Sequence, residues 1–257
     1  MTEELSPRER ALVATGAELA ELIRHRSAEV LLALLDNQAL DETQLSLLLY
    51  RKDLPAEVLA EVVLRKHLLK SYRVKRALAL HPLTPRLEGM RLLRDLYPMD
   101  LVQVTLMPGI SPELKLKAEQ QVIARLPQLP LGQKIALARR GPARAVGALL
   151  AEGHPNIVSV ALDNPRMTEA QILRVLSREK LSATVVPAIL RHAKWPLRYN
   201  VRLALVRHPM TPLAALLSFL PNLTASDLRD LASPGIVPEN IRRYLQAEVV
   251  RRTRSKP

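Results

Sequence analysis

Apolar positions recur along the chain with the period of an α-helix, in one short segment after another. Leu197, Val201, Ala204 and Leu205 lie at i, i+4, i+7 and i+8, which places them on one face of a helix. No segment shows the sustained alternation of apolar and polar residues that a half-buried strand requires. We therefore predict an all-α protein. The predicted helices span residues 7–25, 28–36, 41–51, 55–68, 71–80, 84–95, 98–106, 111–126, 130–140, 142–152, 155–163, 168–178, 182–193, 197–207, 211–220, 224–232 and 237–252.

Capping residues and prolines mark where these helices begin. Thr84-Pro85 and Thr211-Pro212 each place a capping hydroxyl before a proline at the first helical position. The loops between predicted helices are short, about two to five residues, so consecutive helices should pack antiparallel. Each pair then has an apolar stripe that it cannot bury alone, and neighbouring pairs must stack. We expect a right-handed α-solenoid of stacked antiparallel helix pairs.

One large segment of the chain occurs twice, about 127 positions apart. The motif HPLTP at 81–85 returns as HPMTP at 208–212, and LDN at 35–37 returns at 162–164. A repeated sequence of this size predicts a repeated structure. The predicted layout is a capping helix at 1–26, a first repeat block at 27–126, a connecting helix pair at 127–153, a second block at 154–252 and a basic tail at 253–257, all in one continuous solenoid.

Two segments carry a resemblance to a known class of proteins. NVRLALVRHPMTPLAALLSFL at 200–220 and SVALDNPRMTEAQILRVLS at 159–177 resemble bacterial HEAT-like and leucine-rich-repeat-variant α-solenoids. In those, a helix that ends in an Asn-Pro or His-Pro loop precedes a capped helix. The resemblance covers residues 28–252 and implies a HEAT/armadillo-like architecture. The leucine-rich-repeat-variant type can carry a Cys-ligated iron–sulfur module, which this cysteine-free chain cannot hold.

The charge of the chain is unevenly distributed. The net charge is +13, but residues 1–61 hold 12 acidic against 6 basic residues. Three stretches, 62–87, 120–151 and 180–226, contain no acidic residue. Such asymmetry is typical of a surface for a polyanion. A basic protein with no anionic ligand is the alternative, and the sequence leaves both open.

Basic residues at matched positions of the two copies are the candidate binding residues. A cationic ridge in a curved solenoid could follow the phosphates of a nucleic acid, although Arg and Lys also serve only to solvate helices. Trp195 lies within the second cluster, and we favour a packing role over base stacking because its counterpart is Leu68. The candidates are Arg65, Lys66, Lys70, Lys75, Arg139, Arg140, Arg191, Lys194, Arg198 and Arg202.

The sequence points away from catalysis, metals and cofactors. The absence of cysteine excludes disulfides, thiolate catalysis and Cys-ligated metals. We interpret His81 and His208 as residues that end helices, and Asp36 and Asp163 as turn residues. No phosphate-binding glycine loop, Ser-His-Asp order or HExxH motif is visible. We expect no catalytic residue, no metal and no cofactor.

These observations favour a binding protein. The N-terminus shows no signal peptide, and no apolar stretch approaches the roughly 18 residues of a membrane span, so we expect a soluble, cytoplasmic protein. The expected function is a non-catalytic α-solenoid scaffold that binds an acidic protein segment or a polyanion. The alternative is a DNA- or RNA-binding protein that contacts the phosphate backbone. A HEAT-like alkylpurine DNA glycosylase is less favoured, because that class needs aromatic residues and a carboxylate in its cleft.

Overall fold

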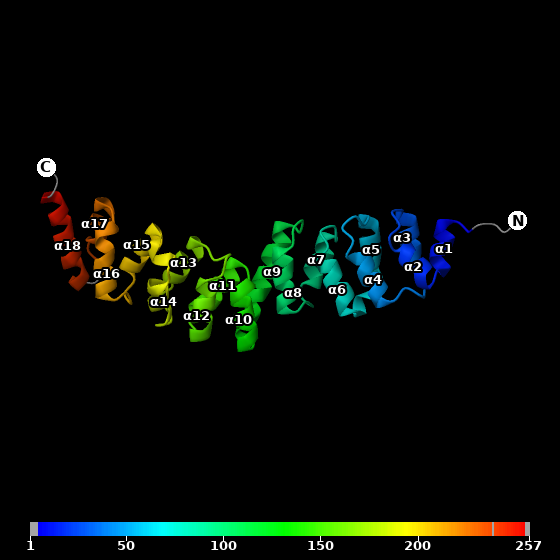
Figure 1. The fold of residues 1–257 in the computed structure, drawn as a ribbon, viewed down its shortest axis with the longest axis horizontal. Coiled ribbons are helices and arrows are strands. Elements are labelled where there is room, and N and C mark those ends of the chain that lie inside the picture. Colours follow the sequence, from blue (N-terminus) through cyan, green and yellow to red (C-terminus); the bar gives the residue numbers. More distant parts are fainter. Residues whose placement is uncertain (1–4, 238, 255–257) are drawn as a thin grey trace. The chain divides into compact units, whose positions relative to one another are not determined.

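The computed structural model describes residues 5–237 and 239–254. Within them the chain forms eighteen α-helices and four short 3₁₀-helices and no strand, which confirms the all-α class. The chain divides into two compact units, Met1–Arg125 and Leu126–Pro257, here called unit 1 and unit 2. In each unit the helices follow one another in chain order (Figure 1).

Unit 1 contains nine of the α-helices and one 3₁₀-helix. They are α1 (Pro7–Val13), α2 (Gly16–Leu22), α3 (Ala28–Leu34), α4 (Glu42–Leu49), α5 (Ala56–Leu64), η1 (Leu68–Lys70), α6 (Tyr72–Ala79), α7 (Arg86–Leu92), α8 (Pro98–Leu106) and α9 (Pro112–Arg125).

Unit 2 contains the other nine α-helices and three 3₁₀-helices. They are η2 (Leu126–Gln128), α10 (Leu131–Arg140), α11 (Ala143–Glu152), α12 (Pro155–Leu162), α13 (Glu169–Leu176), α14 (Val185–Arg191), η3 (Trp195–Leu197), α15 (Tyr199–Arg207), α16 (Leu213–Phe219), η4 (Leu220–Asn222), α17 (Ala225–Leu231) and α18 (Glu239–Arg254).

The prediction of a single helix over 7–25 was wrong. The chain leaves helical geometry at Ala14 and Thr15, and it enters α2 through Gly16, whose φ of 55° lies in the left-handed region. The carbonyls at the end of α1 have no donor within the helix, and Asn37 supplies one. Its Nδ2 donates to the carbonyl oxygens of Ala11 and Ala14 at 2.8 and 2.9 Å. The break is therefore held by a residue more than twenty positions later, which the local pattern could not reveal.

The predicted division of the chain is finer than the two units and stays a prediction. At its C-terminal end, Thr253 and Arg254 of the predicted tail belong to α18, so the tail is shorter than expected. Residues 255–257 of that tail lie outside the described part of the chain.

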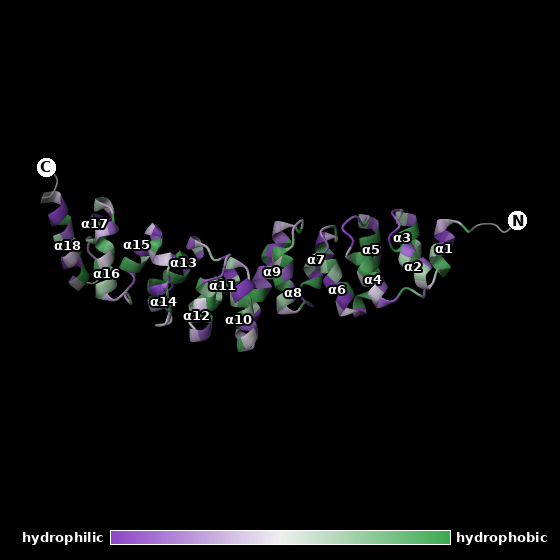
Figure 2. Cartoon of the chain, viewed as in Figure 1, coloured by the Kyte–Doolittle hydropathy of each residue, from purple (hydrophilic) through white to green (hydrophobic). Residues whose placement is uncertain are grey.

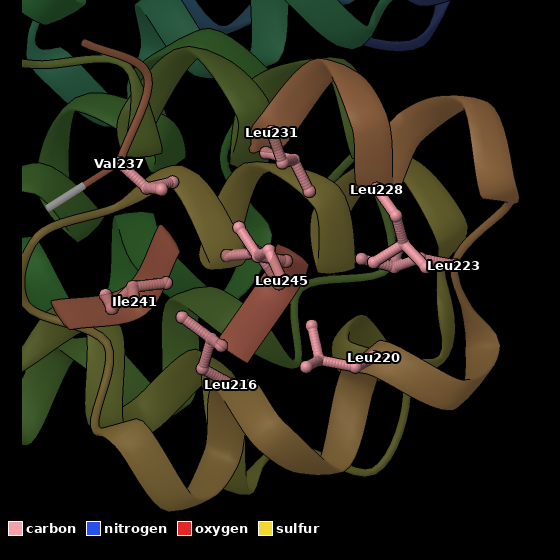
Figure 3. Close-up of a cluster of buried hydrophobic side chains, with 9 residues drawn as sticks. Leu216, Leu220, Leu223, Leu228, Leu231, Val237, Ile241 and Leu245 are labelled. Atoms are coloured by element: carbon pink, nitrogen blue, oxygen red, sulfur yellow. The ribbon is translucent and has the colours of Figure 1, made fainter. Parts of the chain in front are cut away.

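Packing within each unit is local in the sequence. The main helix contacts join an element to the next one or the next but one, such as α4 with α6, α8 with α9 and α13 with α15. The helices of both units carry hydrophobic as well as hydrophilic residues (Figure 2). Figure 3 shows the resulting core at the end of unit 2, where Leu216, Leu228 and Leu245 from three different helices meet, each fully buried. Burial of each leucine contributes about 1.5–3 kcal/mol.

Side chains of later helices also bond the backbone of loops that follow earlier helices. Arg125, the last residue of α9, donates from Nη1 to the carbonyl oxygen of Leu96. In unit 2, Arg252 of α18 donates in the same way to Leu223. Leu96 and Leu223 lie in the loops after α7 and η4, where a backbone carbonyl has no donor from a helix ladder and the arginine supplies one. These bonds hold α9 and α18 against the segments that precede them in their own units.

Several hydrogen bonds occur in both units at positions 127 residues apart. Arg125 and Arg252 are one such pair. The hydroxyl of Tyr72 donates to the carboxylate of Asp100, as that of Tyr199 does to Asp227. These bonds join residues 28 or 29 positions apart, which is roughly the length of one helix pair.

Candidate partner-binding surfaces

Four of the ten candidate cations have partners inside the protein, and Arg65 is the most engaged. Its guanidinium lies 2.7 Å from the carboxylate of Asp36 and 2.9 Å from that of Glu61, and it donates to the carbonyl of Leu35. Partial burial lowers the pKa of Arg65, but the hydrogen bonds with the two carboxylates raise it by more, so the pKa lies above its ordinary value. Arg65 thus remains charged and is held at the end of α3, away from a free ligand-binding role.

Lys75, Arg202 and Lys194 are the other three. Lys75 Nζ lies 2.5 Å from the Asp95 carboxylate. Arg202 donates from Nε to the carbonyl of Pro196 at 3.2 Å, and its guanidinium carbon lies 5.9 Å from the ring centre of Phe219. Lys194 is exposed, with Nζ 4.2 Å from the centre of the Trp195 ring. Its ammonium remains open to solvent on its other side.

The other six candidates are exposed. Their side chains make no hydrogen bond or ion pair with any residue that the structure describes. Two of them lie before and at the end of η1 in unit 1, and four belong to unit 2, at the end of α10 and on both sides of η3. They are Lys66, Lys70, Arg139, Arg140, Arg191 and Arg198.

Nearly all of the net charge resides in unit 2. Unit 1 contains 18 Lys and Arg against 17 Asp and Glu, a net charge of +1. Unit 2 contains 20 against 8, a net charge of +12. The ion pairs of unit 1 include Arg73–Glu42 and Arg76–Asp100 besides those of Arg65 and Lys75. The cations of unit 1 are therefore mostly compensated locally.

Unit 2 lacks several of the acidic residues that compensate the cations of unit 1. The residue 127 positions after Glu61 is Ala188, and the one after Asp95 is Asn222. Arg202, the counterpart of Lys75, consequently bonds backbone carbonyls instead of a carboxylate. Without acids at these positions, the surface around η3 is positive.

Trp195 has a packing role, as predicted. The side chain is 1% exposed, and Nε1 donates to the carbonyl oxygen of Leu162 at 3.1 Å. Its ring is therefore not available to stack on a base.

The two histidines of the matched loops lie at helix ends, as interpreted from the sequence. His81 Nδ1 accepts the backbone N–H of Leu83, and its Nε2 lies 2.7 Å from the carbonyl oxygen of Arg51, so the neutral ring donates from Nε2. His208 accepts the backbone N–H of Met210, and burial lowers the pKa of its imidazole. No group of three or more His, Asp or Glu among the described residues is placed to hold a metal ion.

A groove beside each histidine was not anticipated from the sequence. In unit 2 it has a volume of about 640 Å³ and lies between α13 and α15, with Leu176, Leu203 and Met210 among its lining residues. In unit 1 it has a volume of about 290 Å³, with Leu49 and Ala77 in its lining. No periodicity or motif signals these grooves, because they depend on how two helices and a His-Pro loop meet.

No helix in the described part of the chain combines the length and the apolar character needed to cross a bilayer. Comparisons of the sequence with protein-family models and with curated proteins, and of the structure with solved structures, give no match.

Proposed function

We propose that each unit is an α-solenoid of HEAT-like helix pairs and that the two units arose by internal duplication. Local packing of helices in chain order supports the solenoid arrangement. Recurrence of the Tyr72–Asp100 and Arg125–Leu96 bonds at an offset of 127 residues supports the duplication.

The proposed function is non-catalytic binding of an acidic partner by the surface of unit 2. The observation that carries this proposal is the concentration of charge, +12 on unit 2 against +1 on unit 1. Arg191, Lys194 and Arg198 lie within the acid-free stretch 180–226, and all three are exposed. Exposed cations in a unit with a large positive net charge attract anionic partners and increase their association rate. The lack of cysteine fits a reducing compartment such as the cytoplasm.

A nucleic acid is the second candidate partner. The same three side chains can approach phosphates, and each phosphate contact adds about one to the slope of log affinity against log salt. A protein partner with acidic side chains would show a weaker dependence, because fewer condensed counterions are released.

The test is binding of the full chain to labelled single-stranded DNA, duplex DNA, RNA and polyglutamate, measured by fluorescence anisotropy between about 50 and 200 mM salt. The variant carries Arg191→Glu, Lys194→Glu and Arg198→Glu. The control carries Lys66→Glu, Lys70→Glu and Lys117→Glu, an equal change of charge at exposed positions of unit 1.

We expect the unit 2 variant to lose binding and the unit 1 variant to retain most of it, with far-UV circular dichroism unchanged in both. Equal loss in the two variants would contradict the assignment to unit 2. No binding of any of the four probes at low salt would refute the proposed function.

A further inference from the structure

The grooves of the two units are built from equivalent positions. Seven of the ten residues that line the unit 1 groove have a counterpart 127 positions later in the lining of the unit 2 groove. Both grooves have an alanine from the helix before the loop, Ala77 or Ala204, and the histidine of the His-Pro loop. The small alanine side chain leaves the space that a larger residue would fill.

In unit 1 a loop covers one side of the groove, and in unit 2 the equivalent loop does not. In unit 1 the loop after α8 lines the groove, and a Cβ built on Gly109 would lie 3.0 Å from Pro82 Cβ. In unit 2 a Cβ built on Gly235 meets no atom within 4 Å, and the loop after α17 does not line the groove. This difference accounts for the larger volume in unit 2 and leaves its apolar lining uncovered.

The rim of the unit 2 groove also differs in charge. Arg207 stands where unit 1 has the buried Leu80. Arg178 is exposed, whereas its counterpart Arg51 is bound to the carbonyls of Ile23 and His25. Two arginines and one acidic residue, Glu179, therefore surround an apolar lining in a unit of net charge +12.

We propose that the unit 2 groove binds an extended acidic protein segment by one or two of its apolar side chains. This inference rests on the proposed function and names its partner class and site. Leu173, Leu203 and Met210 contact the apolar side chain, while Arg178 and Arg207 bind carboxylates on either side of it. Arginine binds carboxylates with two parallel hydrogen bonds, which gives direction as well as affinity.

The lining favours a protein segment over a nucleic acid. Proteins hold single-stranded nucleic acid by stacking bases on aromatic rings, and no aromatic residue lines the unit 2 groove. Aliphatic side chains and a methionine instead match the apolar anchors that peptides insert into grooves.

The experiment selects short random peptides displayed on phage against the full-length protein, and then measures the enriched peptides by fluorescence anisotropy. We expect enrichment of acidic peptides with a leucine, isoleucine, methionine or phenylalanine between the acidic residues. Enrichment of basic peptides, or of acidic peptides without an apolar residue, would overturn the proposal, as would no enrichment.

Three variants locate the binding site of the enriched peptide. Ala204→Phe fills the groove without changing any charge, and we expect it to weaken binding by tenfold or more. Arg207→Leu restores the residue of unit 1, and we expect a similar loss. Arg243→Leu removes the same charge from an exposed position of α18 outside the groove and should change affinity by no more than about threefold.

The sign of the rim is tested by Glu179→Gln, which removes the one negative charge and should tighten binding of the acidic peptide. Weaker binding in this variant would mean that the groove prefers a cationic segment. Unchanged affinity in both Ala204→Phe and Arg207→Leu would overturn the groove assignment. If the variant with Arg191→Glu, Lys194→Glu and Arg198→Glu meanwhile abolishes polyglutamate binding, the proposed function stands. Only the assignment of the peptide site to the groove is then wrong.

Discussion

Asn164 is a buried amide whose chemistry can be inverted by one conservative substitution. Its Nδ2 donates to the carbonyl oxygens of Ala138 and Gly141 at 2.7 and 3.4 Å, where α10 ends, and its Oδ1 accepts the backbone N–H of Arg166 at 2.7 Å. The side chain is 3% exposed. Asn164→Asp keeps the shape and the acceptor but replaces the donor by an oxygen that faces two carbonyls.

The new carboxyl group is buried either as a carboxylate or in its protonated form, and each form has a free-energy cost. A carboxylate without a donor costs several kcal/mol to bury. Uptake of a proton avoids that cost but is itself unfavourable at pH 7, by about 4 kcal/mol for an unfolded pKa near 3.9. The protonated group restores one short bond and leaves the weaker contact with Gly141 unmade, at a cost of roughly 1 kcal/mol. We therefore expect Asn164→Asp to lower the free energy of unfolding by about 3–5 kcal/mol at pH 7.

The penalty depends on pH in a defined direction. Because burial raises the folded-state pKa of the new carboxyl above its unfolded value, the folded variant binds a proton more readily. The penalty is complete above the folded pKa and shrinks as the pH falls toward 3.9. Between pH 7 and pH 5 the variant should recover up to about 2.7 kcal/mol relative to the parent protein.

Urea unfolding followed by Trp195 fluorescence measures this effect, since the chain has one tryptophan and it is buried in unit 2. Asn222→Asp makes the same chemical change at an exposed position and serves as the control. A loss below about 1 kcal/mol, or one that is equal at pH 5 and pH 7, would refute the buried donor role of the Asn164 amide.

Two further predictions concern a tyrosine and two glycines. Burial and the hydrogen bond to Asp100 raise the pKa of Tyr72 to about 12, so its contribution to stability is complete below pH 10 and is lost as the pH rises toward 12. In urea titrations between pH 9 and pH 11, Tyr72→Phe should therefore reduce the fall of the unfolding free energy with pH. An unchanged fall in the variant would contradict the assignment. Gly153→Ala places a Cβ 2.1 Å from Ser182 Cβ at a φ of 71°, whereas Gly235→Ala at a φ of 82° meets no atom within 4 Å. Thermal unfolding should show a loss of about 2–5 kcal/mol for the first and about 1–2 kcal/mol for the second, and equal losses would rule out the steric contact.

Helix positions could be predicted because their causes are local. The capping boxes of Ser6 with Glu9 and of Asp41 with Gln44 are local in this sense, since each joins residues three positions apart. The break between α1 and α2 was missed because its stabilising donor, Asn37, lies far along the chain. Local pattern thus accounts for most of the helices and fails where a distant side chain completes a helix end.

The candidate surface could be predicted only as a distribution of charge. Sequence counts identified the basic segments, but not that Arg65 and Lys75 are bound to carboxylates while Arg191 and Arg198 are exposed. That distinction depends on residues about 20 to 30 positions earlier or later, across the helix contacts. The unit 2 groove could not be predicted, because it arises from the separation of two loops in space.

The long-range bonds from side chains to carbonyls have a direction along the chain. Among the described residues, each such bond runs from a later donor, such as Asn37, Arg125, Asn164 or Arg252, to a carbonyl 23 to 33 positions earlier. During translation, every acceptor is therefore synthesised before its donor. The most recent of these carbonyls in a nascent chain have no donor until the next 23 to 33 residues are added. Removal of residues from the C-terminus leaves carbonyls without these donors, whereas removal from the N-terminus leaves donor side chains without these carbonyls. Since any residue supplies a backbone carbonyl, these bonds restrict the residue type at the donor position and not at the acceptor position.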